Sequence, residues 1–178
     1  MSRIQTPSAD TATGARADLF AQIKKAAGRV PNAYAAIGAL EPNALKAMLQ
    51  ADGALSAGTL SSRDRETIKI VVSQVGGCDY CVAAHSQIGK MVGLPPETLK
   101  QIRAGEPTGD AKRDALTHFV RKLVRTSGTV SEAEFKAILD AGYTEAQLVE
   151  ISLAIAVIVF TNVFNRINDT TIDFPAVA

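Results

Sequence analysis

The 178-residue chain has few cysteines, few aromatic residues and almost no net charge. Its two cysteines are too few for the disulfide framework of a small secreted scaffold, and a lone pair is more typical of a catalytic, redox-active or metal-binding site in an intracellular protein. Nineteen Lys and Arg against eighteen Asp and Glu leave a formal charge of +1. This balance lacks the clustered positive charge that selects nucleic acid or an anionic membrane surface, so we expect no nucleic-acid partner.

Long hydrophobic runs are also missing. The first sixteen residues mix Ser, Thr, Asp, Arg and Gly, without the apolar stretch of a secretory signal. The strongest apolar run, Leu153 to Phe160, is well short of the ~18 residues that a membrane span requires. We therefore expect a cytoplasmic protein with no membrane partner, and we interpret the run as a buried helix.

Helix start and stop signals flank almost every segment of apolar periodicity, which predicts an all-α fold. Val, Ile and Thr are frequent in two segments, but both are longer than typical strands and lack period-two alternation. Residues 1–15 are predicted to be a flexible N-terminal tail, and residues 16–178 a single all-helical domain. The expected helices cover 18–27, the segments after Pro31 and Pro42, 63–75, 78–92, 96–104, 110–126, and the segments after the capping boxes Ser131/Glu134 and Thr144/Gln147.

Chemistry-bearing residues concentrate around the start of the helix expected at 78–92. At 100° per residue, Cys78, Cys81 and His85 fall within a ~60° arc of one helix face, so they can form one site. Gly76 and Gly77 break the preceding helix, which puts Cys78 at a helix N-terminus, where the partial positive charge favours a thiolate. His85 is one turn beyond Cys81. The helix dipole thus favours a thiolate at Cys78, and the imidazole favours a thiolate at Cys81.

A thiol needs activation to attack a peroxide at neutral pH, and His85 could supply it as a base. Glu66 lies on the preceding helix, from which it could reach back across the Gly-Gly turn to orient this histidine. A carboxylate with apolar neighbours is more often buried and paired, although Glu66 could also be a simple first-turn partner of the helix dipole.

The pattern of Glu66, eleven residues, Cys78-x-x-Cys81, three residues and His85 resembles the signature of the alkylhydroperoxidase D (AhpD) family in the carboxymuconolactone decarboxylase superfamily. The resemblance implies an all-α, AhpD-like multi-helix domain built from packed helix hairpins and assembled as a homo-oligomer, a trimer or hexamer. It also implies hydroperoxide reduction through a dithiol/disulfide cycle, with no cofactor and no bound metal. Cys81 would be the peroxidatic cysteine that becomes a sulfenic acid, and Cys78 the resolving cysteine and proton donor. His85 and Glu66 would form a proton relay, and a lipoyl-like or thioredoxin-like dithiol would be the reductant.

One position departs from this pattern. The best-known peroxidase members resemble Cys-x-His-Cys, and here the third position is Tyr80. A tyrosine can donate a hydrogen bond but does not titrate near neutral pH. The departure concerns the peroxidase rate, the reductant and the substrate that the resemblance implies, and it does not concern the dithiol cycle itself.

Three other interpretations of the cysteine pair stay open. Two cysteines one turn apart can be small buried hydrophobes. Two thiolates, an imidazole and a carboxylate are also acceptable zinc ligands, although structural zinc sites usually take their ligands from two separate knuckles. Finally, the domain could be a non-enzymatic redox-responsive helical module whose assembly changes with its disulfide state.

Other polar and sulfur-containing residues are assigned to ordinary structural roles. We predict that His118 lies on a solvated basic face, and that Met48 and Met91 fill the core. Asn162, Asn165 and Arg166 share about one face at the end of the last helix. They could line the site or a subunit interface, but helix capping is the favoured explanation.

Overall fold

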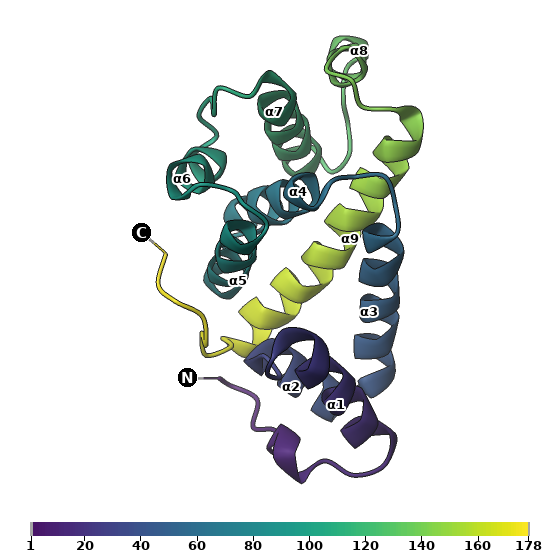
Figure 1. Ribbon diagram of the computed structural model, residues 1–178, viewed down its shortest axis with the longest axis vertical. Coiled ribbons are helices and arrows are strands. Elements are labelled where there is room, and N and C mark those ends of the chain that lie inside the picture. Colours follow the sequence, from purple (N-terminus) through teal and green to yellow (C-terminus); the bar gives the residue numbers. More distant parts are fainter. Residues whose placement is uncertain (1, 178) are drawn as a thin grey trace.

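A computed structural model describes residues 2–177, which form an all-α domain in which no strand occurs within the described range (Figure 1). Residues 1 and 178, the outer ends of the predicted tail and domain, lie outside that range. The elements in chain order are η1 Ala9–Thr11, α1 Ala15–Ala27, α2 Asn32–Leu40, α3 Pro42–Ser56, α4 Ser62–Val75, α5 Asp79–Met91, α6 Pro96–Ala104, α7 Ala111–Arg125, α8 Glu132–Asp140 and α9 Glu145–Asn168.

Local capping chemistry explains why the helices begin where the sequence predicts. The Ser61 side chain accepts the Asp64 backbone N–H at the start of α4. Both predicted capping boxes are formed, Ser131 with Glu134 before α8 and Thr144 with Gln147 before α9. These side chains satisfy backbone N–H groups that have no partner within the helix, so the all-α prediction and these helix starts are confirmed.

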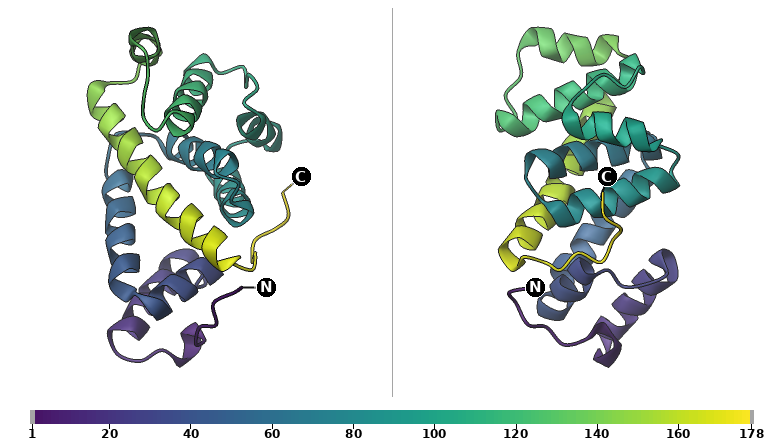
Figure 2. Two further views of the ribbon diagram at one scale, coloured as in Figure 1. Left: turned by 180° about the vertical axis from the view of Figure 1, so that it is seen from behind. Right: turned by 90° about the vertical axis from the view of Figure 1, so that its left-hand side faces the viewer.

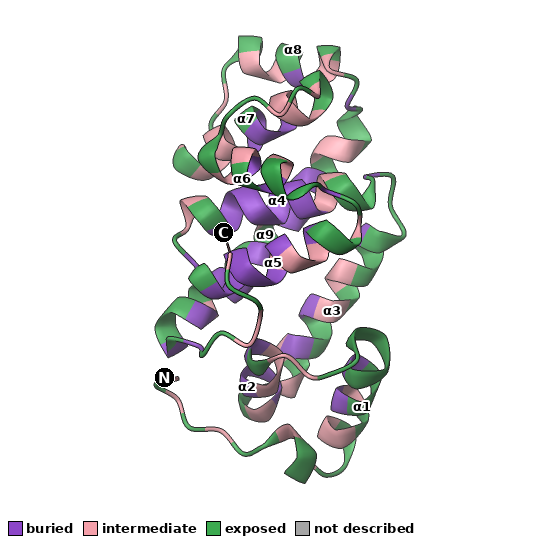
Figure 3. Cartoon of the chain, turned by 60° about the vertical axis from the view of Figure 1, so that its left-hand side comes forward, coloured by how far each residue is buried: buried purple, intermediate pink, exposed green. Residues whose placement is uncertain are grey.

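Helix α4 forms the centre of the domain. It packs against α5, α7 and α9, and every residue from Glu66 to Ser73 is buried. Figure 2 shows α9 crossing the molecule diagonally with α3 along one side of it. Burial is concentrated on α4 and α5 (Figure 3).

The hydrophobic core has two parts. The larger cluster surrounds α4 and includes Ile68, Ile70 and Leu116, which are almost fully buried. The smaller cluster joins α1, α2 and α3 through residues such as Phe20 and Leu45. Met48 belongs to this smaller cluster, which confirms its predicted role as core filler.

The interpretation of α9 as a buried helix is correct for only one of its faces. Ile151, Ala154 and Ile158 are buried, whereas Val149 is 71% and Ile167 59% exposed. The helix is also longer than the apolar run suggested, so by length and composition alone it could cross a bilayer. In the domain its buried face contacts α2, α3, α4 and α5.

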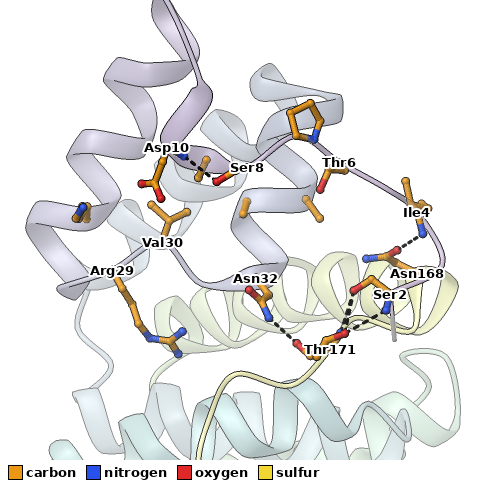
Figure 4. A pocket seen from close by; sticks show the side chains of 15 residues that line it. Ser2, Ile4, Thr6, Ser8, Asp10, Arg29, Val30, Asn32, Asn168 and Thr171 are labelled. Atoms are coloured by element: carbon orange, nitrogen blue, oxygen red, sulfur yellow. Dashed lines mark hydrogen bonds between the residues drawn. The ribbon is translucent and has the colours of Figure 1, made fainter.

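The N-terminal residues lie against the C-terminal end of α9. The backbone N–H of Ile4 donates to the Asn168 side-chain oxygen at 2.8 Å, and the Ser2 backbone N–H donates to the Thr171 hydroxyl at 3.1 Å (Figure 4). These contacts line a polar pocket that also includes Arg29. The start of α1 at Ala15 falls on the last residue of the predicted tail.

Candidate redox site

Cys78 and Cys81 lie in the first turn of α5, as the spacing predicts. Gly77 has φ +64°, a left-handed conformation that glycine adopts without strain, and it turns the chain from α4 into α5. Cys78 is the N-cap residue of α5, and its sulfur accepts the Cys81 backbone N–H at 3.3 Å. The two cysteines form a disulfide with their Cα atoms 5.3 Å apart. The pair can therefore store two electrons in one helical turn.

Glu66 and His85 are brought together across the α4–α5 hairpin. The His85 Nδ1 atom lies 2.8 Å from Glu66 Oε2, and the Glu66 side chain is buried. The expectation that this carboxylate is buried and paired is confirmed. The contact fixes the orientation of the imidazole on the helix that carries Cys81.

Two further charges extend this contact into a partly buried network. Lys69 lies 3.6 Å from the other oxygen of Glu66 and 2.6 Å from Asp52 of α3. Burial by itself would raise the pKa of Glu66, but His85, through its charge and hydrogen bond, and Lys69 outweigh burial and lower that pKa below the usual range. Glu66 is therefore ionised at neutral pH and available as a partner for a protonated imidazole.

A cavity of about 530 Å³ opens beside one cysteine of the pair. Cys81 and His85 both line it, while Cys78 is absent from its lining. Much of the wall is apolar and includes Ala33, Ile88, Met91, Phe174 and Pro175. The geometry thus separates the two sulfurs, since the cavity reaches Cys81 alone.

Asn165 lines the site, which was the less favoured of its two explanations from the sequence. Its side-chain amide nitrogen donates to the Cys81 sulfur at 3.4 Å, and it lines the same cavity. The favoured explanation of helix capping is wrong for this side chain, because α9 passes the start of α5. The capping explanation holds for Arg166, which lies in the last turn of α9, where the helix dipole stabilises a positive charge. Asn162 instead accepts a hydrogen bond from Ser73.

Tyr80 faces the segment that follows α9. Its hydroxyl accepts the Ala33 backbone N–H at 3.1 Å, and its ring meets Phe174 edge to face at 5.5 Å. The Arg29 guanidinium lies over the other ring of this pair, Phe174, and also binds Asp173. Burial raises the pKa of Tyr80 above its usual range, so the residue stays a neutral hydroxyl that joins α5 to the start of α2.

The variant Tyr80→Phe tests this structural role. Removing the hydroxyl leaves the Ala33 N–H buried without a partner at the first turn of α2, so we expect a loss of about 1–3 kcal/mol in the free energy of unfolding. Urea denaturation of the oxidised protein would measure it. A variant as stable as the parent would show that water replaces the lost partner.

The remaining predicted residues fall outside this site or at its edge. His118 is exposed, in agreement with a solvated face. Met91 is 76% exposed on the rim of the cavity, so its prediction as core filler is wrong. Among residues 2–177, no group of three or more His, Cys, Asp and Glu side chains is placed to hold a metal ion.

Residues 42–117, which contain Glu66, both cysteines and His85, match the model of the Carboxymuconolactone decarboxylase family. This segment is therefore similar to proteins of the carboxymuconolactone decarboxylase superfamily. The resemblance drawn from the four spaced residues is thereby confirmed at the level of the superfamily. No curated protein sequence matches the chain.

Solved structures of similar proteins share the fold along nearly the whole chain. A peroxidase-related protein with an alkylhydroperoxidase AhpD core, from Ralstonia eutropha JMP134, superposes with a TM-score of 0.84 at 23% identity, covering 97% of this chain and 92% of its own. A peroxidase-related protein from Silicibacter sp. TM1040 gives 0.83 at 23% identity, with 96% and 91% covered. The predicted AhpD-like fold is confirmed.

A third similar structure is that of a debrominase. The enzyme Bmp8, solved as a cysteine-to-alanine variant with 2,3,4-tribromopyrrole, has a TM-score of 0.79 at 18% identity, with 97% of this chain and 94% of its own covered. The names of proteins with this fold therefore refer to more than one kind of reaction.

Proposed function

We propose that the protein is a thiol-dependent peroxidase that reduces hydroperoxides with the Cys78/Cys81 pair. The observation that carries the proposal is that Cys81 shares a cavity with His85, whereas Cys78 lies outside it and faces the backbone of the same turn. A peroxide entering the cavity would meet one sulfur next to a base, with the second sulfur one turn away.

The first half of the cycle oxidises Cys81. His85 takes the proton of the Cys81 thiol, and Glu66 stabilises the imidazolium that forms. The thiolate attacks the terminal oxygen of the hydroperoxide, so that an S–O bond forms and the O–O bond breaks. The electron pair leaves with the alkoxide, which takes a proton from the Cys78 thiol and departs as an alcohol. The sulfur is oxidised by two electrons to a sulfenic acid.

The second half forms the disulfide that the structure contains. The Cys78 thiolate attacks the Cys81 sulfur, the S–S bond forms and the S–O bond breaks. The hydroxide that leaves takes the proton held by His85 and becomes water. The backbone N–H that Cys78 accepts supports this role, because it stabilises the thiolate that must attack.

A dithiol must return the protein to its reduced form. A lipoyl-like or thioredoxin-like dithiol is the proposed reductant, and the cytoplasm, which keeps such dithiols reduced, is the proposed compartment. The cycle needs no cofactor. A homo-oligomer, a trimer or hexamer, is part of the proposal, and the exposed apolar face of α9, which includes Val149, Val163 and Ile167, supports it.

Reductive dehalogenation is a second candidate function. The aromatic and apolar wall beside Cys81, with Phe174 and Tyr34, suits a flat ring better than it suits a small peroxide. Burial and the carboxylates of Asp52 and Glu66 raise the pKa of Tyr34 to about 12, so it would act there as a neutral hydroxyl. In this reaction the dithiol supplies two electrons, a carbon–hydrogen bond replaces the carbon–halogen bond, and a halide ion and a disulfide are produced.

One titration tests both candidates. The reduced protein is mixed with one equivalent of cumene hydroperoxide or of 2,3,4-tribromopyrrole, and Cys78 and Cys81 are followed by mass spectrometry. We expect hydroperoxide to give one equivalent of alcohol and the intramolecular disulfide, and turnover once a dithiol is added. Release of bromide from 2,3,4-tribromopyrrole, with no oxidation of the cysteines by hydroperoxide, would favour reductive dehalogenation instead. Oxidation that changes only the oligomer size, with turnover at the background of free thiols, would favour a redox-responsive module, and stoichiometric bound metal would favour a zinc site.

A further inference from the structure

We infer that Asn165 is a catalytic residue of this site, whose amide nitrogen stabilises the Cys81 thiolate while its amide oxygen positions the terminal O–H of the hydroperoxide. The inference rests on the proposed peroxidase function and adds a group from a different helix, α9, to the residues of α4 and α5.

The orientation of the Asn165 amide follows from the chemistry of its neighbour. A sulfur in a disulfide or a thiolate can accept a hydrogen bond but cannot donate one, so the nitrogen of the amide must face it. The distance from Asn165 Nδ2 to Cys81 Sγ is 3.4 Å, within the range for a sulfur acceptor. The amide oxygen therefore does not have the sulfur as a partner.

That oxygen has no partner. Asn165 is 4% exposed, and its Oδ1 atom is buried without a hydrogen bond from any described residue. An unsatisfied buried acceptor destabilises the folded state, and in folded proteins such atoms are few and call for an explanation. Because Asn165 lines the cavity beside Cys81, a donor group on a bound molecule would satisfy it.

The other buried asparagines of α9 are different. Asn162 accepts from Ser73, and Asn168 bonds to the Thr170 hydroxyl and to the Ile4 backbone. Their amides hold protein segments together, as buried amides usually do. Only at Asn165, within the described part of α9, does an asparagine contact a sulfur and keep its oxygen free.

A hydroperoxide supplies the donor that this oxygen lacks. Its terminal O–H can donate to Asn165 Oδ1, which holds the terminal oxygen next to the Cys81 sulfur that Nδ2 contacts. The S–O bond then forms to that oxygen, the O–O bond breaks toward the alkoxide, and the hydrogen stays on oxygen in the sulfenic acid. The amide N–H stabilises negative charge on sulfur before the attack, and again when a reductant expels Cys81 from the disulfide.

The test measures the acidity of Cys81 separately from peroxide turnover. In a Cys78→Ser background, the alkylation rate of Cys81 by iodoacetamide is measured against pH for the parent and for Asn165→Asp, Asn165→Ala and Asn162→Ala. The titratable groups that share the cavity with Cys81, namely His85, Tyr34, Tyr80, Arg29 and Asp173, are unchanged in all four proteins, as is Glu66 behind His85.

We expect the alkylation midpoint to rise in Asn165→Ala and to rise further in Asn165→Asp, because a carboxylate facing the sulfur repels a thiolate. With Cys78 restored, the rate constant for cumene hydroperoxide at pH 7 should fall roughly tenfold to a hundredfold in both, the range for a lost hydrogen bond to a charged group. Asn162→Ala, which removes a buried amide that does not touch sulfur, should leave the midpoint at the parent value.

An unchanged midpoint in Asn165→Asp would overturn the inference, and so would an equal shift in Asn162→Ala. If Asn165→Asp fails to fold, Asn165→Ala decides by the same criterion. Should the parent protein not reduce hydroperoxides while the midpoint still shifts in Asn165→Asp, the peroxidase proposal fails and the contact of Asn165 with the thiolate stands. A shifted midpoint with an unchanged peroxide rate would overturn the part assigned to the amide oxygen.

Discussion

Cys81→Ser is expected to abolish hydroperoxide turnover, with a loss of at least about a thousandfold in kcat, because a serine hydroxyl can neither give up two electrons to the peroxide nor form the disulfide. The measurement is the loss of cumene hydroperoxide with dithiothreitol as the reductant. A cavity that reaches Cys81 and not Cys78 is the structural reason for expecting this variant to lose the first step.

Cys78→Ser provides the matched control, since it removes the other sulfur of the same helical turn. It should react with a single equivalent of hydroperoxide and then stop, with a sulfenic acid at Cys81 that dimedone traps. Its serine can still cap α5 in place of the cysteine that caps it now. Full turnover in Cys81→Ser, or trapping of a sulfenic acid at Cys78 in that variant, would exchange the roles of the two cysteines.

Glu66→Ala is expected to give the largest loss of stability, about 3 kcal/mol or more in the free energy of unfolding. The substitution takes a carboxylate from a buried site and leaves Lys69, among residues 2–177, with Asp52 as its acidic partner. It also removes the acceptor that holds His85. Urea denaturation at pH 7 measures the loss, and Lys69→Met combined with Glu66→Ala should recover part of it, because it also removes the buried ammonium that has lost one of its two carboxylates.

The pH dependence of stability separates the charge of Glu66 from its shape. Folding lowers the pKa of this carboxyl below its ordinary value of 4.5. Its contribution to stability is therefore complete above that ordinary value and is lost as pH falls through the lower folded value. Glu66→Gln keeps the shape and cannot titrate, so the difference in unfolding free energy between parent and variant should shrink as the pH is lowered from 5 toward 3. A constant difference over this interval would show that folding does not lower the pKa of Glu66.

Most helix starts, and the shared face of the site residues on α5, could be predicted because they depend on short-range geometry. Capping residues such as Ser61 and Thr144 act on backbone groups three residues away, so the sequence predicts helix starts directly. Cys78, Cys81 and His85 are on one helix, where spacing alone fixes which side chains share a face. The contact of Glu66 with His85 needed one further assumption, a tight hairpin at Gly76 and Gly77.

The rest depends on which helices pack side by side, and no local pattern records that. Asn165 is 84 positions from Cys81 and meets it only because α9 crosses the start of α5. The Lys69 contact with Asp52 of α3 and the Phe174 contact with Tyr80 arise in the same way. By itself, the sequence determined an all-α domain with two cysteines and a histidine in register on one helix. Only the tertiary structure decided which sulfur faces a cavity and which amide reaches it, because burial and long-range contacts are set by the packing of whole helices.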